Sequence, residues 1–215
     1  MKVIGFIILS YLLGSISGSL LLGKFKNIDI RELGSGNAGG TNALRTIGPF
    51  FAFGTILIDI LKGFIPVFLF INFLNFDGIV TVFNFNIIEL APILFGVASV
   101  LGHVYPIYYG FKGGKGAGTL IGIVLAIFPQ SVPWIFLSWL LILIFTGYVG
   151  LSTMCAGIIL VIITIVHPSQ TIFSAFGYFT IGVSIFLIYT HRANIKRMLA
   201  GKENQFQKVM IFKKK

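Results

Sequence analysis

The stretch WIFLSWLLILIFTGYVGLSTMCAGIILVIITIV, residues 134–166, contains no charged residue. Apolar runs of this length are typical of helices that cross the hydrocarbon core of a bilayer, which is ~30 Å thick. The rest of the chain agrees, because 56% of its 215 residues are hydrophobic and only 10% are charged. An average soluble domain carries roughly 25% charged residues. The sequence therefore predicts a membrane protein.

Long apolar runs predict an all-α polytopic fold with seven transmembrane helices, one of them short. They lie at about 3–23, 50–71, 87–108, 117–128, 133–146, 150–166 and 172–190. The first run begins after Lys2 and continues to Gly23, so we expect a retained helix rather than a cleaved signal peptide. The fourth run would cover only ~18 Å at ~1.5 Å per residue, so it is either a half-helix or part of the fifth span.

The placement of positive charge separates these two topologies. With the N-terminus outside and seven crossings, residues 24–49, residues 109–116 and the C-terminal end face the cytoplasm. Of the 16 Lys and Arg residues, only Lys2 then lies outside and only Lys62 within a span. Merging the fourth and fifth spans would leave the basic C-terminal end outside, against the positive-inside bias. We therefore predict seven spans, N-out and C-in.

The predicted organisation is one membrane domain, residues 1–204, and a basic cytoplasmic tail, residues 205–215. The tail either lies along anionic headgroups or is a frayed, solvated end. The net charge of +10 is explained by the positive-inside bias, because the basic residues mark the cytoplasmic side of the membrane. Nucleic-acid binding is therefore not expected.

The first cytoplasmic loop contains GSGNAGGTNALR, residues 34–45. Glycines allow positive φ and close approach to a ligand, and consecutive N–H groups in such turns bind anions. Hydroxyl and amide side chains add neutral hydrogen bonds, and the arginine adds a planar fork suited to phosphate. The candidate ligand-binding residues are Ser35, Gly36, Asn37, Gly39, Thr41, Asn42 and Arg45. The alternative is a flexible loop that caps a helix.

The second cytoplasmic loop contains GFKGGKGAGT, residues 110–119, and an apolar helix follows. Glycines and lysines before a helix N-terminus suit an anion. The loop is not a nucleotide-binding P-loop, because Gly116 replaces the required Ser or Thr. The candidates here are Lys112, Gly113, Gly114, Lys115 and Gly116. The alternative is a flexible loop whose lysines only mark the cytoplasmic side.

Five further polar side chains lie at or within predicted spans. His191 and Asn194 are three residues apart and share a helix face, either toward a polar pocket or at an interfacial helix end. His103 binds an anion, orients a lysine, or is a satisfied structural histidine. Asp59 and Lys62, at i and i+3, predict an internal ion pair, since unpaired charges there would be very unfavourable.

Cysteine chemistry and metal chemistry are not expected. The single cysteine, Cys155, has no disulfide partner, and the sequence shows no cluster of metal ligands. No cofactor is predicted.

Taken together, these motifs resemble the bacterial acyl-phosphate:glycerol-3-phosphate acyltransferases. The shared patterns are SGN-x-G-x-TN-x-x-R at 35–45, D-x-x-KG at 59–63, GH-x-x-P at 102–106, GFKGGKG at 110–116 and HR-x-N at 191–194. They occur in order and run through nearly the whole chain. One departure is Ala193, where the family pattern leads us to expect an acidic residue.

The resemblance implies a seven-helix enzyme of the bacterial inner membrane. It would transfer a fatty acyl group from acyl phosphate to the 1-hydroxyl of sn-glycerol 3-phosphate and release lysophosphatidic acid and phosphate. Its partners would be these two substrates and membrane lipids. We expect direct transfer, with Lys115, Arg45 and backbone N–H groups stabilising negative charge. A donor phosphate oxygen accepts the hydroxyl proton, or His191 acts as general base with Asn194 beside it.

A transporter of phosphate or organic anions is the main alternative. Midplane charges and broken helices are transporter features. Against it, the polar motifs cluster at one face and no inverted repeat is visible. A structural scaffold would not need two anion-type loops.

Overall fold

The computed structural model describes residues 2–73, 81–82, 85–168 and 170–211. The chain divides into two compact units, Met1–Pro129 and Gln130–Lys215, and each is described by itself. The single domain expected over residues 1–204 stays a prediction.

The first unit is helical apart from one very short hairpin. Its elements are α1 (Lys2–Gly14), α2 (Gly18–Lys24), the 3-10 turn η1 (Ile30–Glu32), α3 (Gly40–Thr46), α4 (Pro49–Phe73), β1 (Thr81–Val82), β2 (Phe85–Asn86), α5 (Ile87–Val104), the 3-10 turn η2 (Ile107–Tyr109) and α6 (Ala117–Ile127). β1 and β2 pair antiparallel, with Thr81 opposite Asn86. This hairpin is the one departure from the all-helical expectation in the described residues.

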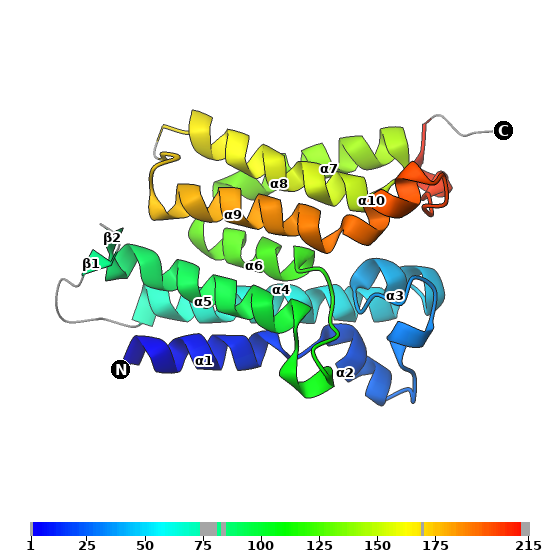
Figure 1. Ribbon diagram of the computed structural model, residues 1–215, viewed down its shortest axis with the longest axis horizontal. Helices are drawn as coiled ribbons and strands as arrows, with labels where there is room; N and C mark the ends of the chain where they lie inside the picture. The colour runs from blue at the N-terminus through cyan, green and yellow to red at the C-terminus, as the bar shows by residue number, and fades with distance from the viewer. Residues whose placement is uncertain (1, 74–80, 83–84, 169, 212–215) are drawn as a thin grey trace. The chain divides into compact units, whose positions relative to one another are not determined.

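Small residues bring the helices of this unit into close contact. In Figure 1, α1 runs beside α5, and α4 lies against both α5 and α6. A Cβ on Gly14 would overlap the backbone of Ser99, and a Cβ on Gly122 would overlap the carbonyl of Ile60. In a lipid environment, where the hydrophobic effect does not drive helix pairing, such close backbone contact is a main source of packing energy.

The first predicted span, residues 3–23, is not one helix. It breaks after Gly14 into α1 and α2, which meet at a bend of 54°. Lys62 donates to the carbonyl of Ile16 at 2.8 Å, and the amide of Gly18 donates to Asp59 at 3.3 Å. These side chains satisfy backbone groups that the break leaves without helical partners, which makes the break tolerable inside an apolar unit.

The second unit is built from longer apolar helices and ends in a docked tail. Its elements are η3 (Pro129–Ser131), which starts at the boundary, α7 (Val132–Thr146), α8 (Val149–Val166), α9 (Ala175–Thr190), α10 (Arg192–Leu199) and η4 (Gln207–Val209). The amide of Phe206 donates to the carbonyl of Gly147 at 2.8 Å, and that of Ile211 donates to the carbonyl of Ile144 at 3.2 Å. The described part of the tail is therefore not frayed, because it supplies donors to carbonyls at the end of α7. Its contact with anionic headgroups stays a prediction.

Helix length supports a membrane protein but not yet a span count. Within the described residues, four helices are long and apolar enough to cross a bilayer, and a fifth results if α1 and α2 form one bent span. The short fourth run is confirmed as a short helix, α6, and α9 is also below spanning length. α7 buries only Leu143 within the protein, so most of its apolar surface is available to lipid.

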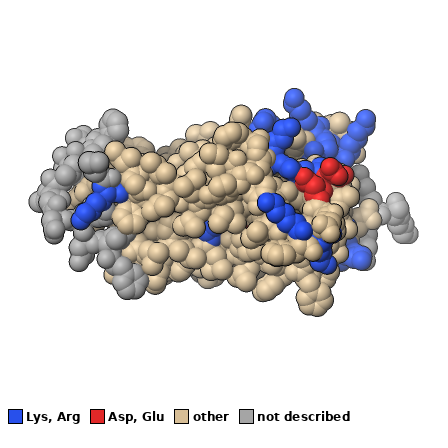
Figure 2. Space-filling view, turned by 90° about the horizontal axis from the view of Figure 1, so that it is seen from below, with Lys and Arg blue, Asp and Glu red and all other residues tan. Residues whose placement is uncertain are grey.

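Charged side chains on the first unit gather at one end. Figure 2 looks onto the face that carries α1 and α2: charges are sparse along its length and cluster at one end. This distribution is typical of an apolar body in lipid with a polar end in water.

Candidate active site

Asn42 shapes the first glycine-rich loop. Its side chain is 2% exposed, its Oδ1 accepts from the amide of Ser35 at 3.0 Å, and its Nδ2 donates to the carbonyls of Ile30 and Leu33 at 3.1 and 2.9 Å. Gly34 has a φ of +56°, and a Cβ there would lie 2.5 Å from the amide oxygen of Asn42. Both ends of this amide therefore hold the loop backbone, and its contact with a ligand stays a prediction.

The second loop is folded back onto the end of α5. Gly110 and Phe111 both have positive φ, at +64° and +59°, which reverses the chain after η2. The amide of Gly113 then donates to the carbonyl of Val104 at 3.2 Å, and that of Gly114 donates to the carbonyl of His103 at 3.1 Å. A Cβ on Gly113 would overlap that same carbonyl of His103, so only glycine allows this close approach.

Four glycines of the two loops use their amides within the protein, and anion binding by the other N–H groups of the loops stays a prediction. The amides of Gly36 and Gly39 donate to the carbonyls of Leu33 and Asn37 at 3.0 and 2.9 Å, and Gly113 and Gly114 are bonded as described above. In this conformation these four donors are satisfied within the protein. The groups that remain for a ligand are chiefly side chains and the N-terminal turn of α6, where Gly116 is the N-cap with a φ of +91°.

The two loops lie next to each other in the first unit. A Cβ on Gly114 would come within 3.2 Å of the carbonyl of Ala38, which belongs to the first loop. An open pocket of about 450 Å³ lies at this junction and is lined by Asp29, Arg31, Glu32, Gly36, Lys112 and Gly113. The candidate residues Gly36 and Lys112, 76 positions apart in sequence, are thus brought to one place.

The remaining loop candidates differ in exposure. Ser35, Gly36 and Lys112 are exposed, whereas Asn37, Gly39, Thr41, Arg45 and Lys115 are half-buried. Arg45 is in the last turn of α3, and Lys115 immediately precedes the N-cap of α6. Lys115, a half-buried cation beside a helix start, is suited to binding an anion at the surface, and the half-buried Arg45 adds a planar charged fork.

A buried charged network lies beneath the second loop. Lys62 Nζ is 2.9 Å from Asp59 Oδ1, which confirms the predicted ion pair, and His103 Nδ1 is 3.4 Å from the same oxygen. The three side chains are 3–5% exposed. His103 faces the loop on its other side, where a Cβ on Gly114 would overlap its Nε2. The predicted substrate contact of His103 is untested, and its position favours the alternative that it orients the lysine-bearing loop.

The second unit contains the other predicted catalytic pair. His191 is the C-cap of α9 and Asn194 lies in the first turn of α10, and both are buried. Nδ1 of His191 lies 2.8 Å from the carbonyl of Leu187. Because a carbonyl only accepts, a neutral ring carries its proton on Nδ1 and keeps Nε2 as the basic nitrogen.

Asn194 is held by a residue that the sequence reasoning missed. Its Nδ2 donates to Glu203 Oε1 at 2.8 Å, and Arg197 Nε donates to Glu203 Oε2 at 2.6 Å. The side chain of Glu203 is only 4% exposed. Glu203 is the only acidic residue after Glu89, and this isolation within a basic segment is the signal that could have found it.

Comparison with known proteins shows the family to which the chain belongs. Residues 4–201 match the family described as Glycerol-3-phosphate acyltransferase. The chain belongs to the glycerol-3-phosphate acyltransferase family. It is 38% identical to the glycerol-3-phosphate acyltransferase of Aquifex aeolicus over 96% of this chain and 100% of that one. It is 32% identical to that of Fusobacterium nucleatum over 94% of this chain and 97% of that one.

Solved structures of this family share the fold. The chain is similar to crystal structures of PlsY, an integral membrane glycerol 3-phosphate acyltransferase, in a glycerol 3-phosphate form and a lysophosphatidic acid form. The TM-scores are 0.84 and 0.82, each at 35% identity over 96% of both chains. The chain is therefore an integral membrane acyltransferase of this family.

Proposed function

We propose that the protein transfers a fatty acyl group from acyl phosphate to the 1-hydroxyl of sn-glycerol 3-phosphate, the first acylation of phospholipid synthesis. The hydroxyl oxygen bonds to the acyl carbon, the bond from that carbon to the phosphate oxygen breaks, and lysophosphatidic acid and phosphate leave. The observation that carries this is the meeting of two cationic loops at one charged end of an apolar helical unit. The two ligand forms of the related crystal structures support the acceptor and the product.

The proposed placement is the bacterial inner membrane, with seven spans, the N-terminus outside and the site at the cytoplasmic face. The positive-inside distribution supports this orientation. The bent α1–α2 pair and the short helices α6 and α9 would complete the count beyond the long spans. A site at the membrane surface would admit a soluble phosphate ester from water and a lipid-tailed donor from the bilayer.

Lys115 and Arg45 are assigned to the negative charge of the reacting phosphates. Acyl phosphate is an activated mixed anhydride, so the protein has to position the hydroxyl and stabilise charge rather than create a leaving group. Lys112 and the exposed Ser35 are assigned to binding, together with Thr41 and Asn37.

The hydroxyl proton has two possible acceptors, a donor phosphate oxygen and His191. The contact of His191 Nδ1 with the carbonyl of Leu187 supports Nε2 as the nitrogen that would accept a proton or a hydrogen bond. His191→Gln separates these versions: retention of most of kcat would exclude the base, and loss of kcat with little change in KM would support it.

The deciding experiment is product formation by the purified protein. Acyl phosphate with glycerol 3-phosphate is expected to give lysophosphatidic acid, whereas acyl-CoA in parallel is expected to give none. Lys115→Ala and Arg45→Ala are expected to lower kcat/KM by about 100-fold or more. Lys26→Ala, which removes an exposed cation from the same segment as Arg45, is the matched control. Absence of product with every donor would refute the proposal.

A further inference from the structure

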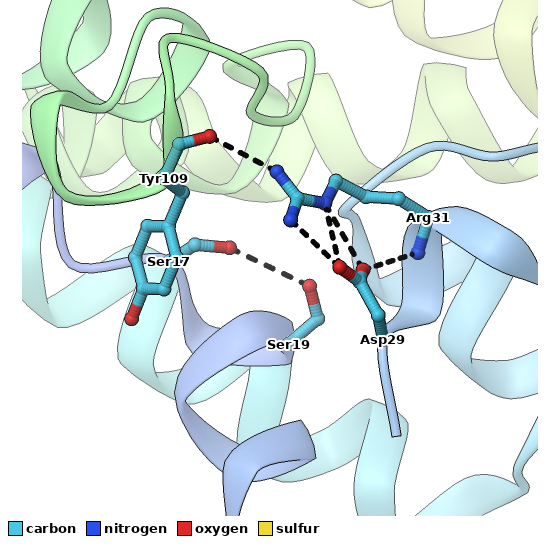
Figure 3. A network of polar contacts seen from close by, with 5 residues as sticks. All are labelled: Ser17, Ser19, Asp29, Arg31 and Tyr109. Atoms are coloured by element: carbon cyan, nitrogen blue, oxygen red, sulfur yellow. Dashed lines mark hydrogen bonds and ion pairs between the residues drawn. The ribbon is translucent and has the colours of Figure 1, made fainter. Parts of the chain in front are cut away.

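Arg31 joins the two glycine-rich loops through one guanidinium group. It lies on η1, where its Nε and Nη2 donate to the carboxylate of Asp29 over 2.6–3.1 Å. Nη1 donates to the carbonyl of Tyr109 at 3.0 Å, although the two residues are 78 positions apart. Figure 3 shows the guanidinium between these two partners.

Tyr109 marks the point at which the second loop changes direction. It is the last residue of η2, and the next two residues have positive φ. Its ring packs against a buried apolar cluster that includes Leu20 and Ile30, and Lys24 Nζ lies 5.4 Å from the ring centroid. A bond to the Tyr109 carbonyl therefore acts where the second loop begins.

We propose that Arg31 is a positioning residue that holds the second loop, and with it Lys112 and Lys115, at a fixed place against the first loop. This rests on the proposed function, in that it takes the two loops as the elements that bind the substrate phosphates. The pocket at the junction is lined from both loops and includes Arg31 itself, so its shape depends on this bond.

The chemistry of the side chain fits this role. A guanidinium is a rigid planar fork whose donors point in fixed directions, whereas a lysine ammonium is a compact point charge on a flexible stem. Asp29 orients the fork and also accepts from the backbone amide of Arg31 at 2.9 Å. Hydrogen bonds from Arg31 hold the pKa of Asp29 below its ordinary value. Each of the three guanidinium nitrogens donates to a protein acceptor, so the orientation of the fork is fixed by the protein.

Kinetics of Arg31→Gln and Arg31→Lys give the first test. Both variants are expected to raise KM for glycerol 3-phosphate by about tenfold, since loss of one charge-assisted hydrogen bond loosens the loop. Lys26→Gln removes an exposed cation from the same segment and is expected to change KM less than about twofold, because it breaks no such bond. Full retention of KM by Arg31→Lys would show that only charge matters and would overturn the proposal.

A double-mutant cycle tests whether Asp29 acts through Arg31. If it does, Asp29→Asn combined with Arg31→Gln is no worse than Arg31→Gln alone. Additive effects of the two substitutions on KM would mean that Asp29 has a separate role and would contradict the proposal.

Loop position is measured without reference to activity. Spin labels at Glu32→Cys and Phe111→Cys, in a Cys155→Ser background, report the distance between the two loops. Arg31→Gln is expected to broaden or shift this distribution, and Lys26→Gln to leave it unchanged. A broadened distribution in a protein without acyltransferase activity would keep the positioning role and reject the proposed function. An unchanged distribution in an active Arg31→Gln enzyme would reject the positioning role alone.

Discussion

Removal of Lys62 from the buried network is expected to destabilise the protein strongly. Lys62→Met leaves the Asp59 carboxylate, 3% exposed, without its cation and leaves the carbonyl of Ile16 without its donor. Breaking a buried ion pair by removing one partner costs about 3–5 kcal/mol. The orphaned carbonyl adds about 1 kcal/mol or more. We therefore expect a loss of about 4–6 kcal/mol in the free energy of unfolding.

The same substitution also has a predicted rescue. Asp59→Asn removes the other charge, so the double variant Asp59→Asn/Lys62→Met contains no unpaired buried ion. We expect it to be more stable than Lys62→Met by about 1–2 kcal/mol, even though the carbonyl of Ile16 stays unsatisfied. Lys26→Met, at an exposed position, is the matched control for loss of a lysine and is expected to have little effect.

The assay is the loss of helical circular dichroism as SDS is titrated into mixed micelles. The midpoint and slope give relative free energies of unfolding for the four proteins of the cycle and for the control. Strictly additive effects of the two single substitutions would refute the view that these residues stabilise the fold as a pair. So would a Lys62→Met variant as stable as Lys26→Met.

Three further predictions concern the loops. Asn42→Ala removes three hydrogen bonds to the loop backbone and is expected to cost about 3 kcal/mol in the same SDS assay. The matched control Asn72→Ala, whose exposed side chain makes one local bond, is expected to cost less than about 0.5 kcal/mol. Gly113→Ala is expected to lower kcat/KM for lysophosphatidic acid formation by about tenfold or more, because the added Cβ displaces the loop. The control Gly182→Ala, whose added Cβ would meet no atom within 4 Å, is expected to leave kcat/KM unchanged. The pKa of Asp29 is lower in the folded protein than in the unfolded chain, where it is about 3.9. Its ionised carboxylate therefore stabilises the fold at pH values above about 3.9. The stability difference between wild type and Asp29→Asn is therefore expected to stay constant from about pH 8 to 5 and to vanish on further acidification.

Local spacing in the sequence was sufficient to predict part of this structure. Asp59 and Lys62 are one helical turn apart in an apolar run, so their pairing follows from helix geometry and the cost of an unpaired charge. The short α6 was predictable as well, since Phe128 and Pro129 end the run that starts at Ala117.

Contacts between distant segments were not predictable in the same way. The bend between α1 and α2 interrupts a continuous apolar run, and what makes it tolerable is a lysine more than forty positions away. The bond from Arg31 ends on a backbone carbonyl, which no residue type encodes. A single sequence reports side-chain character and periodicity, whereas these features depend on which backbone groups the fold leaves without partners.

The glycines of the second loop are a further case in which the fold decides the partners of backbone groups, and they bear on the proposed mechanism. Their pattern suggested an N–H cradle for phosphate, but Gly113 and Gly114 donate to carbonyls at the end of α5 and pack directly on His103. Their observed role is to bring the loop close to the buried Asp59–Lys62–His103 network, and in the proposed mechanism the lysines are the groups that meet phosphate. Side-chain cations follow phosphates of different shape more easily than a fixed backbone nest does. A rigid platform with adaptable cations suits the proposed reaction, in which the acceptor and the donor each carry a phosphate group in a different setting.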